Sequence, residues 1–429
     1  MGFVSFLVFA AAFFHVVLAN NNDADLQKIF ASADFGMIPS VGDEVRSDAN
    51  LTVPEIIAKY GYPIETHSVF TEDGYILQLH RRATRFTKLH RIPYGRNCGP
   101  APGKKPVFVQ HGLLCDSSNF VITGVNKGLA YLLADSCYDV WLGNARGNTY
   151  SRRHITLSPD TDKEAFWDFS WNEMGIYDLP ANFDHILAIT GAEKLYYIGH
   201  SMGTTMFFVC MTERPEYNSK VALMSALAPV AFTQNMISPL RFIAPFSTQI
   251  EWLLEMIGLH EFAANSPFYD LIGATLCNET NPWHEICTNV LFLLCGFDPE
   301  QMDPALTPEI LGQLPAGTSV RTIVHYAQGV TSGQFQKYDF GEEKNLLVYG
   351  SPVPPVYDWT KMTAPVALYW AQNDWLGVPD DTLRVMQNVV NLQRFWRINF
   401  DKFNHLDFLF ALDLVPFVNR PVLEFLHGY

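Results

Sequence analysis

The chain has 429 residues, of which 48% are apolar and 14% are aromatic, and its formal net charge is -15 at pH 7. This length exceeds the usual size of a single core, so we expect one large domain with an insertion. The acidic charge argues against a nucleic-acid partner and against electrostatic docking on anionic lipid, which leaves apolar contact as the route to any lipid surface.

The first 19 residues are predicted to be a secretory signal peptide. Residues 3–18 are almost wholly apolar, and the small residue Ala19 suits cleavage before Asn20. The alternative, an N-terminal membrane anchor, is disfavoured because the apolar run is short for a bilayer span and is interrupted by His15. We therefore predict a secreted or lysosomal protein without a transmembrane anchor.

The segment that follows carries few structural signals. Residues 20–50 are polar and aperiodic, which predicts an N-terminal arm or a propeptide. Asn50 and Asn278 each begin a sequon for N-glycosylation, which applies in the secretory pathway. The seven cysteines are an odd number, so an oxidised chain leaves at least one thiol unpaired.

Strand and helix signals then alternate along the first part of the core, residues 51–232. Residues 66–70 and 75–80 cluster β-forming side chains around a Glu-Asp-Gly turn, which predicts an antiparallel hairpin. The later alternation predicts parallel strands joined by crossover helices, with ligands at the carboxyl ends of the strands. In chain order we expect strands at 107–110, 138–142, 195–198 and 221–230, and helices at 126–133, 172–187 and 204–211.

This alternation stops at residues 233–356. The segment is apolar, largely helix-compatible and broken by Pro and Gly, and it is far longer than an ordinary connection between strands. We predict a mainly helical cap, or lid, inserted into the core, which resumes at residues 357–429. The helix-compatible stretches are 240–259, 266–297 and 308–313, and the resumed core carries strands 366–370 and 395–398 and helices 381–390 and 415–426.

The stretch 195–211 contains a nucleophile elbow motif. Gly199 and Gly203 flank Ser201 in a G-x-S-x-G pattern that lies between a predicted strand and a predicted helix, the context that makes the motif informative. Such a turn forces its central residue into a strained backbone conformation that only neighbours without bulk tolerate. We therefore predict that Ser201 is a nucleophile held above the sheet.

A serine hydroxyl needs a base to take its proton and a third group to orient that base. In this architecture the acid follows a late strand. Asp374 lies just beyond the strand predicted at 366–370, so it is the predicted acid. Asp380 and Asp381 are better explained as charges that stabilise the N-terminus of the next helix.

The base is expected in the loop after the last strand. His405 lies there, just past the strand predicted at 395–398, and is the predicted base. Asp407 is too close to this histidine in sequence to orient the far ring nitrogen. The other histidines that we considered, none of which follows the last strand, are His111, His200, His325 and His427.

Backbone N–H groups must stabilise the oxyanion of the tetrahedral intermediate. One donor is expected from the residue after the nucleophile, Met202, and the other from the loop after residues 107–110, where we assign Leu113. No Cys/His cluster has zinc spacing, and the chemistry requires no metal and no other cofactor.

With these residues in view, the chain resembles the acid lipase family of α/β-hydrolases over nearly everything after Leu51. The resemblance implies an α/β fold with a mostly parallel eight-stranded sheet, helices on both faces and an inserted lid. It also implies hydrolysis of neutral lipid esters, either acylglycerols or sterol esters, by an acid-tolerant enzyme. The motifs that carry it are Tyr62-Pro63, residues 71–75, His111-Gly112-Leu113-Leu114, residues 141–148, Gly199-His200-Ser201, Asn373-Asp374 and residues 404–408.

The family pattern also covers individual positions. It places the catalytic side chains at Ser201, Asp374 and His405 and the oxyanion donors at Leu113 and Met202. It pairs Cys277 with Cys287 in the cap and leaves Cys295 free. The chain departs from the family where Met202 replaces a glutamine and where Trp370-Ala371-Gln372-Asn373 replaces a Gly-Gly form.

We therefore predict a monomeric serine lipase that acts on lipid esters at an oil–water or membrane interface. The alternatives are a carboxylesterase of soluble esters and a non-enzymatic lipid-binding relative, which the three catalytic side chains disfavour. Aromatic residues in the cap favour a pocket for long acyl chains, although they also suit the cap's own core. They are Phe242, Phe246, Trp252, Phe262, Phe268, Tyr269, Trp283 and Phe292.

Overall fold

The structure is a computed structural model. Several sequence predictions lie outside the residues that it describes, namely the signal peptide, nearly all of the N-terminal arm, the sequons at Asn50 and Asn278, and the Cys277–Cys287 pair, and these stay predictions. The described residues are 48–49, 51–77, 89–96, 98–99, 101–242, 244–246, 249, 251, 254, 256, 258–262 and 294–429.

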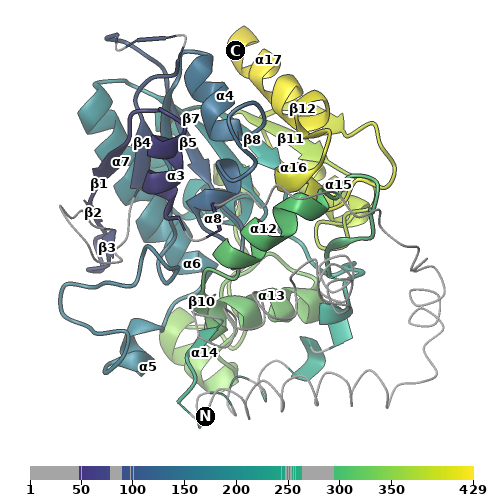
Figure 1. Cartoon of the computed structure of the whole chain (residues 1–429). Coiled ribbons are helices and arrows are strands. Elements are labelled where there is room, and N and C mark those ends of the chain that lie inside the picture. The colour runs from purple at the N-terminus through teal and green to yellow at the C-terminus, as the bar shows by residue number, and fades with distance from the viewer. Residues whose placement is uncertain are drawn as a thin grey trace.

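An eight-stranded sheet forms the centre of the molecule, with strand order β1-β4-β6-β5-β7-β8-β11-β12 (Figure 1). Neighbours from β6 to β12 are parallel. At one edge, β4 runs antiparallel to both of its neighbours, β6 and β1. This confirms the predicted fold class. The strands are β1 (Glu65–His67), β4 (Leu89–Ile92), β6 (Asp139–Leu142), β5 (Pro106–Gln110), β7 (Leu195–His200), β8 (Val221–Leu227), β11 (Val366–Trp370) and β12 (Leu392–Arg397).

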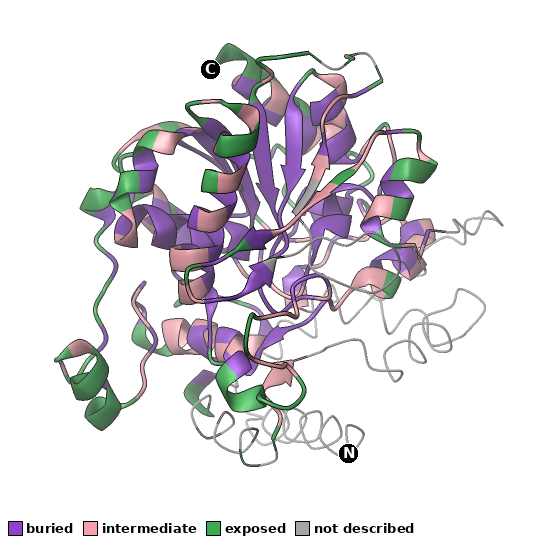
Figure 2. Ribbon diagram, turned by 90° about the vertical axis from the view of Figure 1, so that its left-hand side faces the viewer, coloured by how far each residue is buried: buried purple, intermediate pink, exposed green. Residues whose placement is uncertain are grey.

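Helices cover both faces of the sheet, because its parallel strands are apolar on both sides (Figure 2). In β5, Val107 and Val109 enter one buried core and Phe108 enters the other. The first core includes α3 (Val53–Lys59), α4 (Leu129–Asp135), α16 (Asp407–Phe410) and α17 (Arg420–Gly428), and the second includes α6 (Trp171–Glu173), α7 (Leu179–Thr190), α8 (Met202–Glu213) and α15 (Pro379–Asn388).

Two π-helical turns lengthen these helices. One, η2 (Met174–Asp178), joins α6 to α7, so the helix predicted at 172–187 is present as one continuous run. The other, η8 (Val415–Asn419), leads into α17. The short helices elsewhere in the core are α5 (Lys163–Phe166), η1 (Ser117–Phe120), η3 (Pro215–Lys220) and η7 (Trp359–Lys361).

The predicted first hairpin is only partly correct. The stretch 66–70 divides between β1, which joins the large sheet, and β2 (Val69–Phe70), which pairs antiparallel with β3 (Ile76–Leu77) in a separate two-stranded sheet. The sequence did not predict β4 at all. Its Arg91 binds Glu65 on β1 and Asp139 on β6, and contacts between distant strands leave no local sequence signal.

Several element boundaries also differ from prediction, among them that of the last strand, which is Leu392–Arg397 rather than 395–398. Two of the differences have a clear local cause. The helix predicted to begin at 126 begins at Leu129, because Gly128 has an extended backbone and its N–H bonds to Gly124 O, which makes a turn there. The strand predicted to reach 230 ends at Leu227, because Ala228 adopts a left-handed φ of 49° and turns the chain away.

The segment between β8 and β11 contains residues 233–356, which the sequence predicts to be an inserted cap, and that assignment stays a prediction. Its α13 (Val320–Ser332) and α14 (Glu342–Tyr349) were not predicted, whereas α12 (Thr307–Gln313) matches the stretch 308–313. These elements group at one end of the sheet (Figure 1). The exact cap boundaries stay a prediction. Its other described elements are η4 (Pro239–Phe242), η5 (Ala244–Phe246), β9 (Glu261–Phe262), η6 (Pro304–Leu306) and β10 (Thr318–Ser319), which pairs with β9.

The sequence left the pairing of the core cysteines open. In the structure Cys98 and Cys137 form a disulfide, while Cys115, Cys210 and Cys295 are buried free thiols. The free thiol of Cys295 agrees with the family pattern. Across the described part of the chain, every helix is too short or too polar to serve as a membrane span.

Candidate active site

The turn between β7 and α8 has the strain expected of a nucleophile elbow. Ser201 has φ 53° and ψ -118°, and it lies at the carboxyl end of a central strand. A Cβ on Gly203 would come within 2.6 Å of Gln110 O, and one on Gly199 within 2.8 Å of the Gly203 backbone. Side chains at these two positions would therefore block the close packing that makes the turn possible.

Three side chains from separate loops form a continuous hydrogen-bond chain. The Nε2 atom of His405 lies 2.8 Å from the Oγ atom of Ser201, and its Nδ1 atom lies 2.8 and 2.9 Å from the two carboxylate oxygens of Asp374. The pattern assigns the ring proton to Nδ1, because a carboxylate only accepts, and so leaves Nε2 free to accept the serine proton.

Backbone groups fix the acid in turn. Asp374 Oδ1 accepts hydrogen bonds from Leu376 N at 3.0 Å and from Gly377 N at 2.7 Å. The competing carboxylates face elsewhere, since Asp381 accepts from Asn235 and Asp407 accepts from Asn404 N. Of the acidic residues considered from the sequence, Asp374 is therefore the one that the structure brings to the histidine.

The other histidines that were considered bond to groups away from the serine hydroxyl. His200 Nε2 lies 3.1 Å from the backbone oxygen of His405, and burial lowers the pKa of His200 well below its usual value, so this neutral ring supports the loop as a donor. His325, on α13, bonds through its two ring nitrogens to the hydroxyl of Ser170 and to the backbone oxygen of Gln336. No group of three or more metal-ligand side chains is present in the described ranges.

The two predicted oxyanion donors belong to segments that adjoin the serine. Met202 is the first residue of α8, where backbone N–H groups lack an intrahelical acceptor, and its side chain is packed in the core. A Cβ on Gly112 would lie 3.0 Å from Ser201 Cβ, which places the loop that carries Leu113 directly against the nucleophile. Both segments therefore adjoin the serine, and the N–H groups of Leu113 and Met202 stay the predicted donors.

From the sequence, His111 was an alternative base and a member of the predicted donor loop, and the structure shows how its ring is bound. Its Nε2 atom accepts from Ala145 N at 3.0 Å and from Asn148 Nδ2 at 3.2 Å, which leaves the proton on Nδ1, 2.8 Å from Gly112 O. Burial lowers the pKa of His111 to about 4, so the ring is neutral above that pH. Its bond to the Gly112 carbonyl fixes the plane of the peptide that also carries the Leu113 N–H.

Gly112→Ala tests the tight contact between this loop and the elbow. The added Cβ would lie 3.0 Å from Ser201 Cβ and 3.1 Å from His200 Nδ1, so one of the two loops must shift. Misplacement of this kind can lower turnover by roughly 10²-fold, and we expect kcat for a soluble ester to fall with KM little changed. Gly99→Ala, where nothing lies within 4 Å, is the control that should keep full activity. An unchanged kcat in Gly112→Ala would contradict the proposed donor loop.

Residues of the predicted cap, 233–356, bond to the loops of the site. Ala316 N donates to Leu114 O at 2.7 Å, and the hydroxyl of Tyr326 lies 2.8 Å from Thr205 Oγ1 on α8. The exposed fraction of Ser201 is 8%, that of His405 is 3% and that of Asp374 is 1%. The site is therefore covered in this structure.

Family comparisons agree with this architecture. The family described as alpha/beta hydrolase fold matches residues 105–411, and the partial alpha/beta-hydrolase lipase region matches residues 53–85. Among solved structures, one from Sulfolobus solfataricus has a TM-score of 0.51 at 14% sequence identity and covers 85% of this chain and 99% of its own, which supports the fold alone.

Curated relatives match at much higher identity. Lipase 3 of Drosophila melanogaster is 40% identical over 87% of this chain and 92% of its own length. Gastric triacylglycerol lipase of Rattus norvegicus is 39% identical over 85% of this chain and 89% of its own length. Lipase member K of Mus musculus is also 39% identical, over 85% and 88% of the two chains.

Proposed function

We propose a reaction for this chain on the premise that it belongs to the lipase family of α/β-hydrolases. It is a serine ester hydrolase of the lipase type. Its substrates are acylglycerols, whose ester bonds it hydrolyses, and the names of the gastric relatives print triacylglycerol. The observation that carries the mechanism is the hydrogen-bond chain from Ser201 through His405 to Asp374.

In the acylation step, Ser201 Oγ attacks the ester carbonyl carbon while its proton moves to His405 Nε2. The Asp374 carboxylate stabilises the imidazolium that forms, and the N–H groups of Leu113 and Met202 stabilise the oxyanion. The C–O bond of the ester then breaks, His405 returns the proton to the leaving alcohol, and the acyl group stays on Ser201.

Deacylation repeats these roles with water as the nucleophile. The neutral His405 takes a proton from water as the water oxygen attacks the acyl carbon, and the same backbone donors stabilise the second oxyanion. Collapse of the intermediate transfers the proton from His405 to Ser201 Oγ and releases the fatty acid. No residue beyond those already in contact is required for this cycle.

We propose that the preferred esters are long-chain and water-insoluble. The net charge of -15 leaves apolar burial as the main attraction to lipid. Of the cap aromatics, Phe246 is 48% exposed, whereas Phe262 packs with the small cap core of Leu254, Val320, Val324 and Tyr338, so Phe262 serves the cap itself. Each methylene buried from a longer acyl chain contributes about 0.8 kcal/mol before ordering costs.

A chain-length series tests this preference. We expect hydrolysis rates to rise with acyl length and to be high on emulsified long-chain triacylglycerols, because an apolar site gains binding energy from each added methylene. Rates would be measured by fatty-acid release from soluble and emulsified esters between acid and neutral pH. Fast cleavage confined to short soluble esters would instead establish the carboxylesterase alternative.

We propose that the chain enters the secretory pathway and acts outside the cell or in the lysosome. The Cys98–Cys137 disulfide supports this, since oxidising compartments favour such bonds. The apolar stretch at residues 3–18, which has the pattern of a signal peptide, supports it independently.

A further inference from the structure

A short part of the cap, residues 295–298, is called the cap segment here, and it bonds to both catalytic loops. The backbone oxygen of Cys295 accepts from His405 N and from Trp375 N, each at 3.3 Å. The next carbonyls accept from side-chain amides, Gly296 O from Asn404 Nδ2 and Phe297 O from Asn373 Nδ2, both at 3.0 Å. The segment therefore fixes the loop that carries Asp374 and the loop that carries His405 relative to each other.

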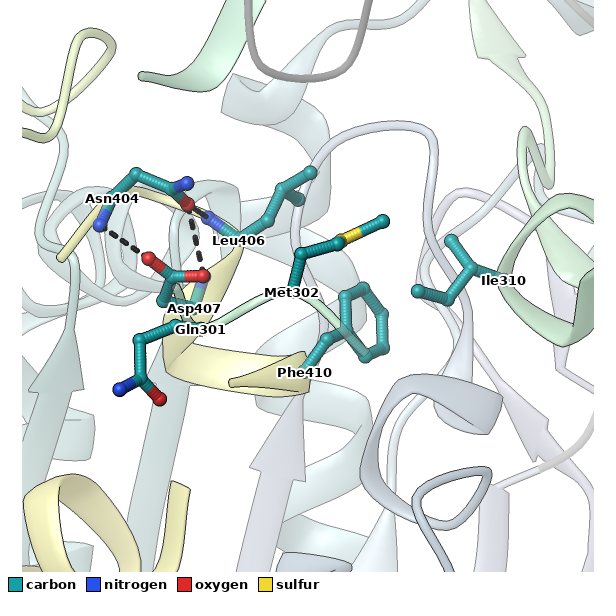
Figure 3. Close-up of a pocket in the computed structure, with 7 residues that line it drawn as sticks. All are labelled: Gln301, Met302, Ile310, Asn404, Leu406, Asp407 and Phe410. Atoms are coloured by element: carbon teal, nitrogen blue, oxygen red, sulfur yellow. Dashed lines mark hydrogen bonds between the residues drawn. The ribbon is translucent and has the colours of Figure 1, made fainter. Parts of the chain in front are cut away.

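The approach is too close for any residue but glycine at its centre. A Cβ on Gly296 would lie 2.1 Å from Asn373 O, and its φ of 113° also favours glycine. Asn404 completes the contact, because its Oδ1 accepts from Leu406 N and Asp407 N while its own N–H donates to Asp407 Oδ2 at 2.7 Å (Figure 3). The cap segment and the histidine loop thus meet at Asp407.

Asp298 ends the cap segment, and its carboxyl lies in hydrogen-bond contact with that of Asp407. The exposed fraction of Asp298 is 0% and that of Asp407 is 4%. Asp298 Oδ1 accepts from Glu300 N at 3.0 Å, whereas Oδ2 is buried without an N–H or neutral O–H donor among the described residues. A protonated Asp407 would supply the missing donor.

We propose that Asp298 and Asp407 share one proton, and that this carboxyl pair is a pH-sensitive clamp that positions the loops of Asp374 and His405. With the proton in place, the O–H of Asp407 donates to Asp298 and joins the cap segment to the histidine loop. When the proton leaves to solvent, two buried carboxylates face each other and repel. The clamp then loosens, and the hydrogen-bond chain to Ser201 loses its alignment.

The direction of the pH effect follows from the burial of the pair. Burial, followed by contact with the other carboxyl, raises the pKa of Asp407, and burial raises the pKa of Asp298 to about 6. An unfolded carboxyl titrates near 4, so the folded state binds more protons than the unfolded state between these values. Stability from the pair is therefore complete below about pH 4 and begins to fall as the pH rises through about 6, where Asp298 ionises. It falls further at higher pH, where Asp407 loses the shared proton.

The surrounding charges agree with this direction. The charged or titratable groups that face the pair are Asp374, Glu300, Lys402 and the buried thiol of Cys295. Lys402 forms an exposed ion pair with Glu300, where solvent screens its charge. The buried Asp374 carboxylate further favours protonation of Asp407.

Asp298→Asn is the variant that separates clamping from general support. An amide keeps an oxygen acceptor for Glu300 N and supplies a permanent N–H donor to Asp407, so no shared proton is required. We expect the fall in Tm of the wild type between pH 5 and pH 8 to become smaller in the variant. We also expect the alkaline limb of kcat/KM to shift upward by about one pH unit. Glu300→Gln makes the same chemical change at an exposed neighbour whose charge solvent screens, so it should change both profiles much less than Asp298→Asn.

The pH profile of Tm does not depend on the proposed function, whereas the pH profile of kcat/KM rests on it. A smaller pH dependence of Tm in Asp298→Asn supports the clamp even in a protein that hydrolyses no ester. The shared proton is refuted if Asp298→Asn lowers Tm by the same number of degrees, and activity by the same factor, at every pH. It is also refuted if the pH profile of Tm equals that of the wild type. Asp407→Asn, which can also donate an N–H across the pair, should give the same flattening of the Tm profile as Asp298→Asn.

Discussion

Ser201→Ala should lower ester turnover by roughly 10⁶-fold while the protein stays folded, the scale on which loss of a serine nucleophile acts in another hydrolase. The serine Oγ is the atom that receives the acyl group, and the ring of His405 would have no proton to take from an alanine. Substrate binding should persist, because the oxyanion donors are backbone groups. Turnover is measured as fatty-acid release, with circular dichroism as the check on folding.

Covalent labelling gives this prediction a second readout. An active-site-directed phosphonate should label the wild type and fail to label Ser201→Ala. Ser225→Ala is the matched control, because Ser225 is a buried serine that lies within β8 and away from the elbow. It should keep both labelling and turnover. Labelling of folded Ser201→Ala at another serine would show that the nucleophile is misassigned.

Local patterns predicted the parts of the site that depend on local backbone geometry. The elbow was predictable because two glycines beside Ser201 are required by contacts within one turn, and its φ of 53° follows from that packing. Asp374 and His405 were predictable because each follows one of the last two strands, β11 and β12, at the carboxyl edge of the sheet. The order of the residues along the chain and their positions at strand ends were therefore enough to predict most of the candidate site.

The rest depends on contacts between distant segments. No pattern around Asp298 or Asp407 shows that the two carboxyls meet, since they are joined only when the cap segment folds over the histidine loop. The role of His111 needed the donors Ala145 and Asn148, which come from the loop after β6. Strand β4 was missed for the same reason, because its partners β1 and β6 determine it.

Asp374→Asn should lower turnover by about 10⁴-fold, or about 5 kcal/mol in activation free energy. The carboxylate of Asp374 offers both oxygens to His405 Nδ1, while Oδ1 also accepts from Leu376 N and Gly377 N. Those two backbone donors would hold the oxygen of an amide in the same place. The amide N–H would then point at Nδ1 and favour the tautomer that carries its proton on Nε2.

In that tautomer Nε2 donates to Ser201 Oγ and has no lone pair with which to take its proton, so geometry survives while general-base catalysis is lost. Asp381→Asn is the control, because that carboxylate bonds to Asn235 at 2.8 and 2.9 Å and contributes nothing to the histidine ring. Both variants would be compared by kcat/KM on a soluble ester, where interfacial binding plays no part. A large loss in Asp381→Asn with turnover preserved in Asp374→Asn would overturn the assignment of the acid.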